Sequence, residues 1–308
     1  MWRCPILILS ANAPVSYGVF ALSRPDRVPL PGGEELLDLV QGAGYEGVDL
    51  GPHGLLGTGT ALVENLERHG LRLCGGWLDF PFAGSDRDFD AALTQARAVL
   101  DDFATVASRQ DGPAPLPTIA DSGSEERRRH PGGGPGLSLD RERWDTFARR
   151  VERVAGEVRD LGLEPTFHHH AVTHVETPVE IDRLLEDTTI DLTLDTGHLV
   201  LGGGDPLEAL ERWQDRVNHV HLKDVDREVM VAGRGSDDPV RDIWERRVFV
   251  ALGEGDVDVP GFMDRLVESG YDGWVVVEQD VVLMDVADVR RAVEDQRRNR
   301  DRLRRWVP

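Results

Sequence analysis

The sequence predicts a closed (β/α)8 barrel of the TIM type, and three observations support this fold class. Eight short apolar runs alternate with eight longer amphipathic segments along the chain, an order typical of parallel β/α architectures. The length of 308 residues suits one such barrel. The alternative, a doubly wound open sheet, usually has a glycine-rich phosphate turn after its first strand, and residues 10–14 (Ser-Ala-Asn-Ala-Pro) contain none.

The predicted strands are the short apolar runs, and the predicted helices are the amphipathic segments that follow them. In order, the strands are 6–10, 47–50, 71–75, 116–120, 164–168, 191–194, 217–222 and 274–277. The helices are 33–41, 61–69, 89–107, 141–161, 178–185, 206–215, 260–268 and 286–306. Pro178 marks a helix start, and Gly44, Gly70 and Gly162 mark helix ends.

Two segments interrupt this rhythm, and both follow a predicted strand. Residues 121–137, rich in glycine and arginine, predict a mobile loop after the fourth strand, and residues 224–258 predict a long excursion after the seventh. The carboxyl ends of barrel strands carry the active site, so both segments are candidate lids, although passive insertion explains 121–137 equally well. We see no repeat or linker, and residues 1–308 are therefore expected to form a single domain.

Composition excludes some partners. A net charge of −21 disfavours nucleic acid and anionic membrane surfaces, which attract basic patches, and favours a small neutral or metal-held substrate. Cys4 and Cys74 lie far apart, which suits a reducing compartment better than a disulfide framework. No apolar run approaches the length of a membrane span. We expect a cytoplasmic protein, and the sequence leaves a homo-oligomer open.

Four strand ends are expected to direct polar side chains to one place. Side chains alternate between the two faces of a strand. Leu194 beside Asp195, and Val220 and Leu222 around His221, are apolar positions that should face the helices. Their polar neighbours then face the barrel interior.

The same alternation orients the remaining two strand ends. Glu278 shares its phase with Val276, and Phe167 leaves His168 and His170 inward. The convergence of Asp195, His221 and Glu278 with His170 or His168 is suited to Mn²⁺, Co²⁺, Fe²⁺ or Zn²⁺.

The only lysine of the chain, Lys223, lies on the same strand face as His219 and His221. Every other basic residue is arginine, so a single retained lysine points to a site that needs a compact ammonium able to lose its proton. A compositional accident is the alternative. Seven of the ten histidines lie between 168 and 221, in the same third of the chain, which favours the functional interpretation.

These motifs resemble the xylose-isomerase-like barrel superfamily of sugar isomerases and epimerases, and within it the inosose dehydratases of inositol catabolism. The matching segments are LDTGH at 194–198, HVHLKD at 219–224, LGEG at 252–255 and GYDGWVVVEQD at 270–280, with FHHH at 167–170 and Glu176-Thr177 typical of the dehydratases. The resemblance covers the chain broadly and is strongest from 160 to 280.

The resemblance implies a metal-dependent lyase that dehydrates a keto-cyclitol such as 2-keto-myo-inositol (scyllo-inosose). An isomerase or epimerase on the same barrel is the alternative, and a non-catalytic metal-dependent sugar-binding barrel is a further one. The implied cofactor is a divalent metal, with Mn²⁺ or Co²⁺ favoured and Mg²⁺, Fe²⁺ or Zn²⁺ as other candidates. The implied partner is a small keto-cyclitol or keto-sugar.

The superfamily's metal ligands are usually Glu, Asp, His and Glu, and Asp195, His221 and Glu278 match the last three. A histidine cluster stands at the first position, so the fourth ligand is His170, His168 or, from the next helix start, Glu176.

Dehydration requires a base for the α-proton and an acid for the leaving hydroxyl. The candidates for these roles are Lys223, His168, His198 and Glu278, and a bound cation is expected to lower the pKa of Lys223. Trp77 at the third strand offers an apolar face to a sugar ring or packs in the core.

Overall fold

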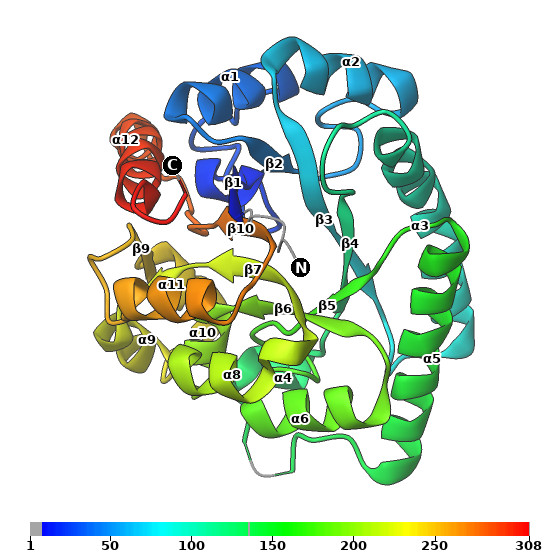
Figure 1. Ribbon diagram of the computed structural model, residues 1–308. Helices are drawn as coiled ribbons and strands as arrows, with labels where there is room; N and C mark the ends of the chain where they lie inside the picture. The colour runs from blue at the N-terminus through cyan, green and yellow to red at the C-terminus, as the bar shows by residue number, and fades with distance from the viewer. Residues whose placement is uncertain (1–7, 135, 308) are drawn as a thin grey trace.

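The computed structural model describes residues 8–134 and 136–307 and contains a closed barrel of eight parallel strands (Figure 1). The strands follow the cyclic order β1-β10-β7-β6-β5-β4-β3-β2. This confirms the predicted fold class and excludes the open sheet. Figure 1 shows the helices as an outer ring around the strands.

Each barrel strand overlaps one predicted apolar run. The strands are β1 (Ile8–Asn12), β2 (Gly47–Asp49), β3 (Arg72–Phe80), β4 (Leu116–Asp121), β5 (Thr166–His168), β6 (Asp191–Asp195), β7 (Val217–Leu222) and β10 (Gly273–Val277). Residues 6 and 7 of the first predicted strand lie outside the described residues, as does Cys4. Strand β3 continues to Phe80, beyond its predicted end at 75.

Eight helices match the predicted amphipathic segments. They are α1 (Gly33–Ala43), α2 (Gly59–His69), α3 (Asp86–Ala107), α5 (Arg141–Asp160), α6 (Pro178–Asp187), α8 (Pro206–Trp213), α11 (Val259–Glu268) and α12 (Val286–Leu303). None of the helices in the described part of the chain is both long and apolar enough to span a membrane.

Further short elements lie in the connections. They are the 3₁₀ turns η1 (Pro14–Tyr17) and η2 (Gln214–Arg216), helices α4 (Glu125–Arg129), α7 (Thr196–Leu201), α9 (Arg227–Gly233) and α10 (Pro239–Glu245), and strands β8 (Asp224–Val225) and β9 (Phe249–Val250). Helix α7 was not predicted. All its residues are buried, so its sequence has no amphipathic periodicity.

The core has two layers, and β10 shows how its strand alternation divides them. Val275 and Val277 belong to the large cluster between the strands and the helices. Val276 belongs to a small interior cluster with Leu9 and Cys74. The predicted phase of this strand is therefore confirmed. Glu278, the residue after Val277, lies at the carboxyl end of the barrel.

The connection after β4 is tied to the barrel by a buried ion pair. Arg127 of α4 is 1% exposed and donates to Glu180 of α6 and to the Leu137 carbonyl. The backbone N–H of Gly132 donates to Glu176 Oε1 at 2.7 Å. Helix α4 also contacts α10 from the connection after β7, so the two long connections meet. That residues 121–137, of which 135 is not described, are mobile and cover the mouth stays a prediction.

Glu176 is completely buried, and its Oε2 lies 3.6 Å from Arg127. Burial raises the pKa of Glu176 to about 7 despite Arg127 and the Gly132 N–H. Burial acts on Glu180 in the same direction, but the hydrogen bond and charge of Arg127, together with backbone hydrogen bonds from Glu176 and Thr177, outweigh it and the pKa of Glu180 is lowered. The arginine therefore compensates one carboxylate better than the other.

A close contact inside the barrel predicts the effect of one added methyl group. A Cβ on Gly47 would lie 2.7 Å from the Trp274 ring and 3.1 Å from the Arg72 carbonyl. We expect Gly47→Ala to lower the free energy of unfolding by about 1–3 kcal/mol through overpacking, measured by urea denaturation. Gly42→Ala in α1, with no atom within 4 Å of its added Cβ, is the control and should be neutral or stabilising. Equal midpoints for the two variants would contradict this account.

The buried Glu176 predicts a pH dependence of stability. Its folded pKa of about 7 exceeds its ordinary value of 4.5, so the folded state holds the proton more tightly and loses stability as pH rises through 7. We expect wild type to lose about 2–3 kcal/mol more than Glu176→Gln between pH 5 and pH 8. Urea denaturation of both proteins at each pH measures the difference. Parallel pH profiles would show that the carboxyl group of Glu176 has an ordinary pKa.

Candidate functional site

Three polar side chains meet at the carboxyl end of the barrel, as the strand alternation predicts. Asp195 ends β6, His221 lies near the end of β7 and Glu278 follows β10. One potential ligand atom from each lies within 4.8 Å of the others. His221 Nδ1 is 3.2 Å from Glu278 Oε2 and 3.7 Å from Asp195 Oδ2.

Lys223 lies in the middle of this cluster and is 1% exposed. Its Nζ donates to Asp195 Oδ2 at 2.9 Å and to Glu278 Oε2 at 2.5 Å, and lies 3.3 Å from Asp280 Oδ1. Burial favours the neutral amine, but attraction to Asp195, Asp280 and Glu278 outweighs it and the pKa lies well above its ordinary value. The lowered pKa expected from the sequence requires a cation beside these carboxylates, and the protein's own groups produce the opposite shift.

The residues after Asp195 place Lys223. The Thr196 hydroxyl donates to the Lys223 carbonyl at 2.7 Å and accepts from the Lys223 N–H at 2.8 Å. A Cβ on Gly197 would lie 2.6 Å from Lys223 Cβ and 2.8 Å from the Phe249 ring. In the Asp-Thr-Gly sequence, Asp195 therefore binds the ammonium of Lys223 and Thr196 fixes its backbone. Gly197 leaves room for its side chain.

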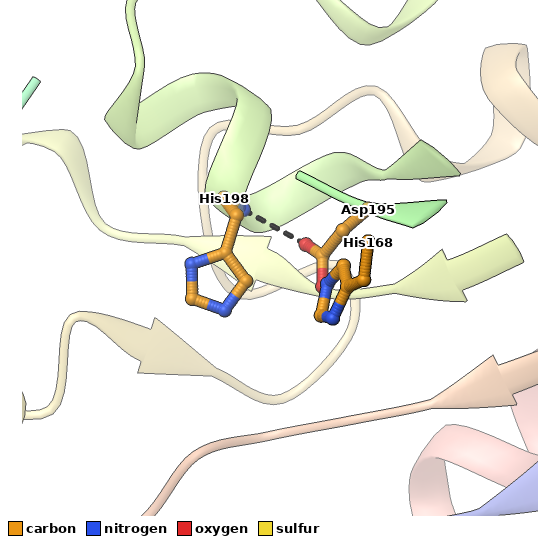
Figure 2. A group of neighbouring side chains, drawn as sticks. All are labelled: His168, Asp195 and His198. Carbon is orange, nitrogen blue, oxygen red and sulfur yellow. Dashed lines mark hydrogen bonds and ion pairs between the residues drawn. The ribbon is translucent and has the colours of Figure 1, made fainter. Parts of the chain in front are cut away.

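A second group joins His168 and His198 to Asp195 (Figure 2). His168 Nε2 lies 3.2 Å from Asp195 Oδ2. The backbone N–H of His198 donates to Asp195 Oδ1 at 2.8 Å, so Asp195 is the N-cap residue of α7. Figure 2 shows the Asp195 carboxylate next to the His168 ring and the backbone of His198. Asp195 thus contacts both the His168 ring and the first turn of α7.

His170 lies beyond the end of β5, so strand alternation does not determine its direction. The structure groups it with His198 and Asp280 rather than with Asp195, His221 and Glu278. Its ring centroid lies 3.6 Å from that of His198. The other proposed fourth ligand, Glu176, bonds Gly132 near Arg127 and belongs to none of the three candidate ligand groups in the described residues.

Burial keeps most of the histidines in this cluster uncharged. It lowers the pKa of His170 and His169 to about 4 and those of His168 and His198 well below 6.5. His221 differs, because attraction to Glu278 and hydrogen bonds to the carboxylates outweigh burial and raise its pKa to about 9.

Burial would raise the pKa values of Asp195 and Glu278. The charge of Lys223 and interactions with the surrounding histidines, among them hydrogen bonds from His221, together outweigh that effect, and both pKa values are lowered. The two carboxylates are therefore ionised at neutral pH.

Asp224 organises the return of the connection after β7. Its carboxylate accepts hydrogen bonds from the N–H groups of Gly253, Gly255 and Val257 at 2.7–3.0 Å. Asp224 is also the first residue of β8, which pairs antiparallel with β9. This explains the Leu-Gly-Glu-Gly motif at 252–255, in which a Cβ on Gly255 would lie 2.4 Å from Asp224 Oδ1.

Sequence reasoning missed Asp280 and Asp49. Asp280 lies two residues beyond Glu278, which was the available signal, and burial raises its pKa to about 6. Asp49 ends β2 between apolar neighbours, and burial together with the charge of Glu278 raises its pKa to about 6. Trp77 lies within β3, is 38% exposed and contacts the rings of His168 and His170 edge-on.

The chemistry of the donor set fits a divalent metal. Two ionised carboxylates and an imidazole converge at Asp195, His221 and Glu278, where unpaired charge in a buried site is costly. Lys223 Nζ already shows that a cation fits between the carboxylates. Carboxylate and imidazole donors suit Mn²⁺, Co²⁺, Fe²⁺ and Zn²⁺.

Comparisons with known proteins give several relatives. Over 268 residues, the chain is 34% identical to the rhizopine catabolism protein MocC of Rhizobium meliloti, covering 83% of this chain and 78% of that protein. It is 39% identical over 140 residues to an inosose dehydratase of Geobacillus kaustophilus (strain HTA426), covering 44% of this chain and 46% of that enzyme. An inosose dehydratase of Lacticaseibacillus casei is 37% identical over 148 residues. The chain thus matches about half the length of the dehydratases.

Solved structures share the fold at low sequence identity. A protein named IOLI, solved with a bound zinc atom, superposes with a TM-score of 0.70 at 14% identity, covering 97% of this chain and 98% of that one. An L-ribulose 3-epimerase superposes with a TM-score of 0.67 at 15% identity, covering 98% and 95%.

A family model described as "Xylose isomerase-like TIM barrel" matches residues 37–305. With this match over most of the chain and the relationship to MocC, the chain belongs to the xylose isomerase-like TIM barrel family.

Proposed function

We propose that this protein is a divalent-metal-dependent carbon–oxygen lyase that dehydrates a keto-cyclitol, with 2-keto-myo-inositol (scyllo-inosose) as its substrate. The observation that carries the proposal is the buried cluster of Asp195, His221, Glu278 and Lys223, in a chain similar to inosose dehydratases. We also propose that the chain forms a single barrel domain and acts in the cytoplasm.

Asp195, His221 and Glu278 would hold the metal. His168 contacts Asp195 through Nε2 and is kept for proton transfer rather than for metal binding. Zinc in the similarly folded IOLI protein is consistent with a metal in this barrel. When bound, the metal supplies Lewis acidity where negative charge develops on the substrate. Mn²⁺ or Co²⁺ remains our preferred identity for this donor set.

Protonation states support distinct roles for the other groups. His168 is uncharged, and with Nε2 donating to Asp195 its Nδ1 carries the lone pair that can accept the substrate's α-proton. Lys223 is protonated and can donate a proton to the leaving hydroxyl. Glu278 is a weaker candidate for the base, because Lys223 and His221 lower its pKa.

Two features suit a cyclitol. The net charge of −21 favours a neutral substrate over an anionic one. Trp77, partly exposed beside His168 and His170, offers an indole face to the apolar C–H side of a ring. In this proposal Trp77 orients the substrate and the polar cluster reacts with it.

The second candidate is a sugar or cyclitol epimerase, because an L-ribulose 3-epimerase shares the fold. An epimerase of this superfamily is expected to use two glutamates as bases on opposite faces of its substrate. This chain has His168 rather than glutamate at the end of β5, which favours the lyase. A non-catalytic sugar-binding barrel is a third candidate and would bind its ligand without turnover.

The proposal is tested with metal-free protein, 2-keto-myo-inositol and added Mn²⁺, Co²⁺, Mg²⁺ or Zn²⁺. We expect a metal-dependent diketone product that absorbs in the ultraviolet. Asp195→Asn should abolish its formation, and His53→Ala, which changes a half-exposed histidine paired with Asp102, should not. An isomeric product without a new chromophore would identify an epimerase, and ligand binding with no product would indicate a binding protein.

The solitary lysine gives a second prediction for this function. Arginine keeps the charge but cannot readily release a proton and needs more space than an ammonium. We expect Lys223→Arg to retain bound metal and fold but to lose about a hundredfold or more in turnover. Steady-state kinetics, elemental analysis and circular dichroism measure these three properties. Full turnover would show that Lys223 is not the acid and would leave the histidines to supply it.

A further inference from the structure

We propose that His170, His198 and Asp280 form a second divalent-cation site at the barrel mouth, distinct from the site at Asp195, His221 and Glu278. One potential ligand atom from each of the three lies within 4.8 Å of the others. The set contains two imidazoles and one carboxylate, which suits a borderline cation such as Zn²⁺.

His198 is the strongest evidence for this site. Its side chain is fully buried, and neither ring nitrogen has a hydrogen-bond partner. Leaving buried polar atoms without partners costs free energy, and native structures rarely do so without a reason. Nε2 lies 3.7 Å from Asp280 Oδ2, so a cation between the two atoms would compensate both.

The tautomer of His170 leaves one ring nitrogen available to a metal. Its Nδ1 lies 2.8 Å from the Ala171 carbonyl, which can only accept, so Nδ1 carries the proton and Nε2 carries the lone pair. Metal-bound histidines commonly donate their other ring N–H to a carbonyl in this way. The rings of His170 and His198 are close, with centroids 3.6 Å apart, and two uncharged imidazoles at this distance suit a shared cation.

Asp280 is held in place from two sides. The Trp244 indole N–H donates to its Oδ2 at 3.3 Å, and Lys223 Nζ lies 3.3 Å from its Oδ1. Trp244 and Phe249, both from the connection after β7, also contact the His198 ring. Two aromatic side chains of this connection, Trp244 and Phe249, therefore line the second site.

The two donor sets should select different metals. Two carboxylates and one imidazole favour a harder cation such as Mn²⁺, and two imidazoles with one carboxylate favour Zn²⁺. The second site lies beside the proposed catalytic metal, but its occupancy does not require the lyase activity. It is therefore testable by metal binding alone.

The experiment counts bound zinc in metal-free protein that has been equilibrated with Zn²⁺ and dialysed. Elemental analysis should find about two ions per wild-type chain and about one in Asp280→Asn and in His170→Gln, each of which leaves three protein ligands at only one site. His53→Ala is the matched control and should keep both ions. Circular dichroism identifies any variant that fails to fold.

Variants of the first site separate the two proposals. Glu278→Gln should lose one ion and keep the one at His170, His198 and Asp280. With Mn²⁺ in excess and Zn²⁺ limiting, wild type should retain zinc and Asp280→Asn should lose it. One ion in wild type that persists in Asp280→Asn and His170→Gln would overturn the second site. Loss of zinc in those variants with none lost in Glu278→Gln would overturn the first site instead.

Discussion

The barrel mouth depends on the attraction between one buried ammonium and three carboxylates. Lys223 contacts Asp195, Glu278 and Asp280 with almost no exposure to water. A buried charge without a partner costs several kcal/mol, so the acids and the lysine require each other. Around them, Thr196 and Gly197 fix the path of the lysine. Positive charge at this place helps to keep the buried Asp195 and Glu278 ionised.

Strand alternation explains why the convergence of Asp195, His221 and Glu278 could be predicted from separate strands. Asp195, His221 and Glu278 each lie next to valine or leucine residues that pack under the helices. Because strand side chains alternate with a period of two, the apolar neighbours determine the direction of the polar ones. The barrel itself was predictable for the same reason, since its strands are apolar runs separated by amphipathic helices.

Residues outside regular strands were not predictable in this way. His170 follows the end of β5, and its position depends on a turn in which its ring nitrogen bonds the Ala171 carbonyl. Glu176 bonds the N–H of Gly132, a contact with a distant loop that no periodicity reveals. The pKa of Lys223 depends on how many carboxylates surround it, and the sequence indicated two of the three. Such features are set by tertiary contacts and not by local pattern.

The Asp224 carboxylate has a consequence for how this scaffold can change. It accepts hydrogen bonds from the N–H groups where the chain returns from its longest connection. The Asp226 N–H donates to the Val248 carbonyl just inside that closure. Residues 227–247 therefore leave and rejoin the barrel at a single fixed point. Parts of this segment that do not reach the mouth can diverge in length and composition, whereas Trp244, which donates to Asp280, couples it to the end of β10. An insertion or deletion in this segment would therefore reach the strand ends through the position of this indole.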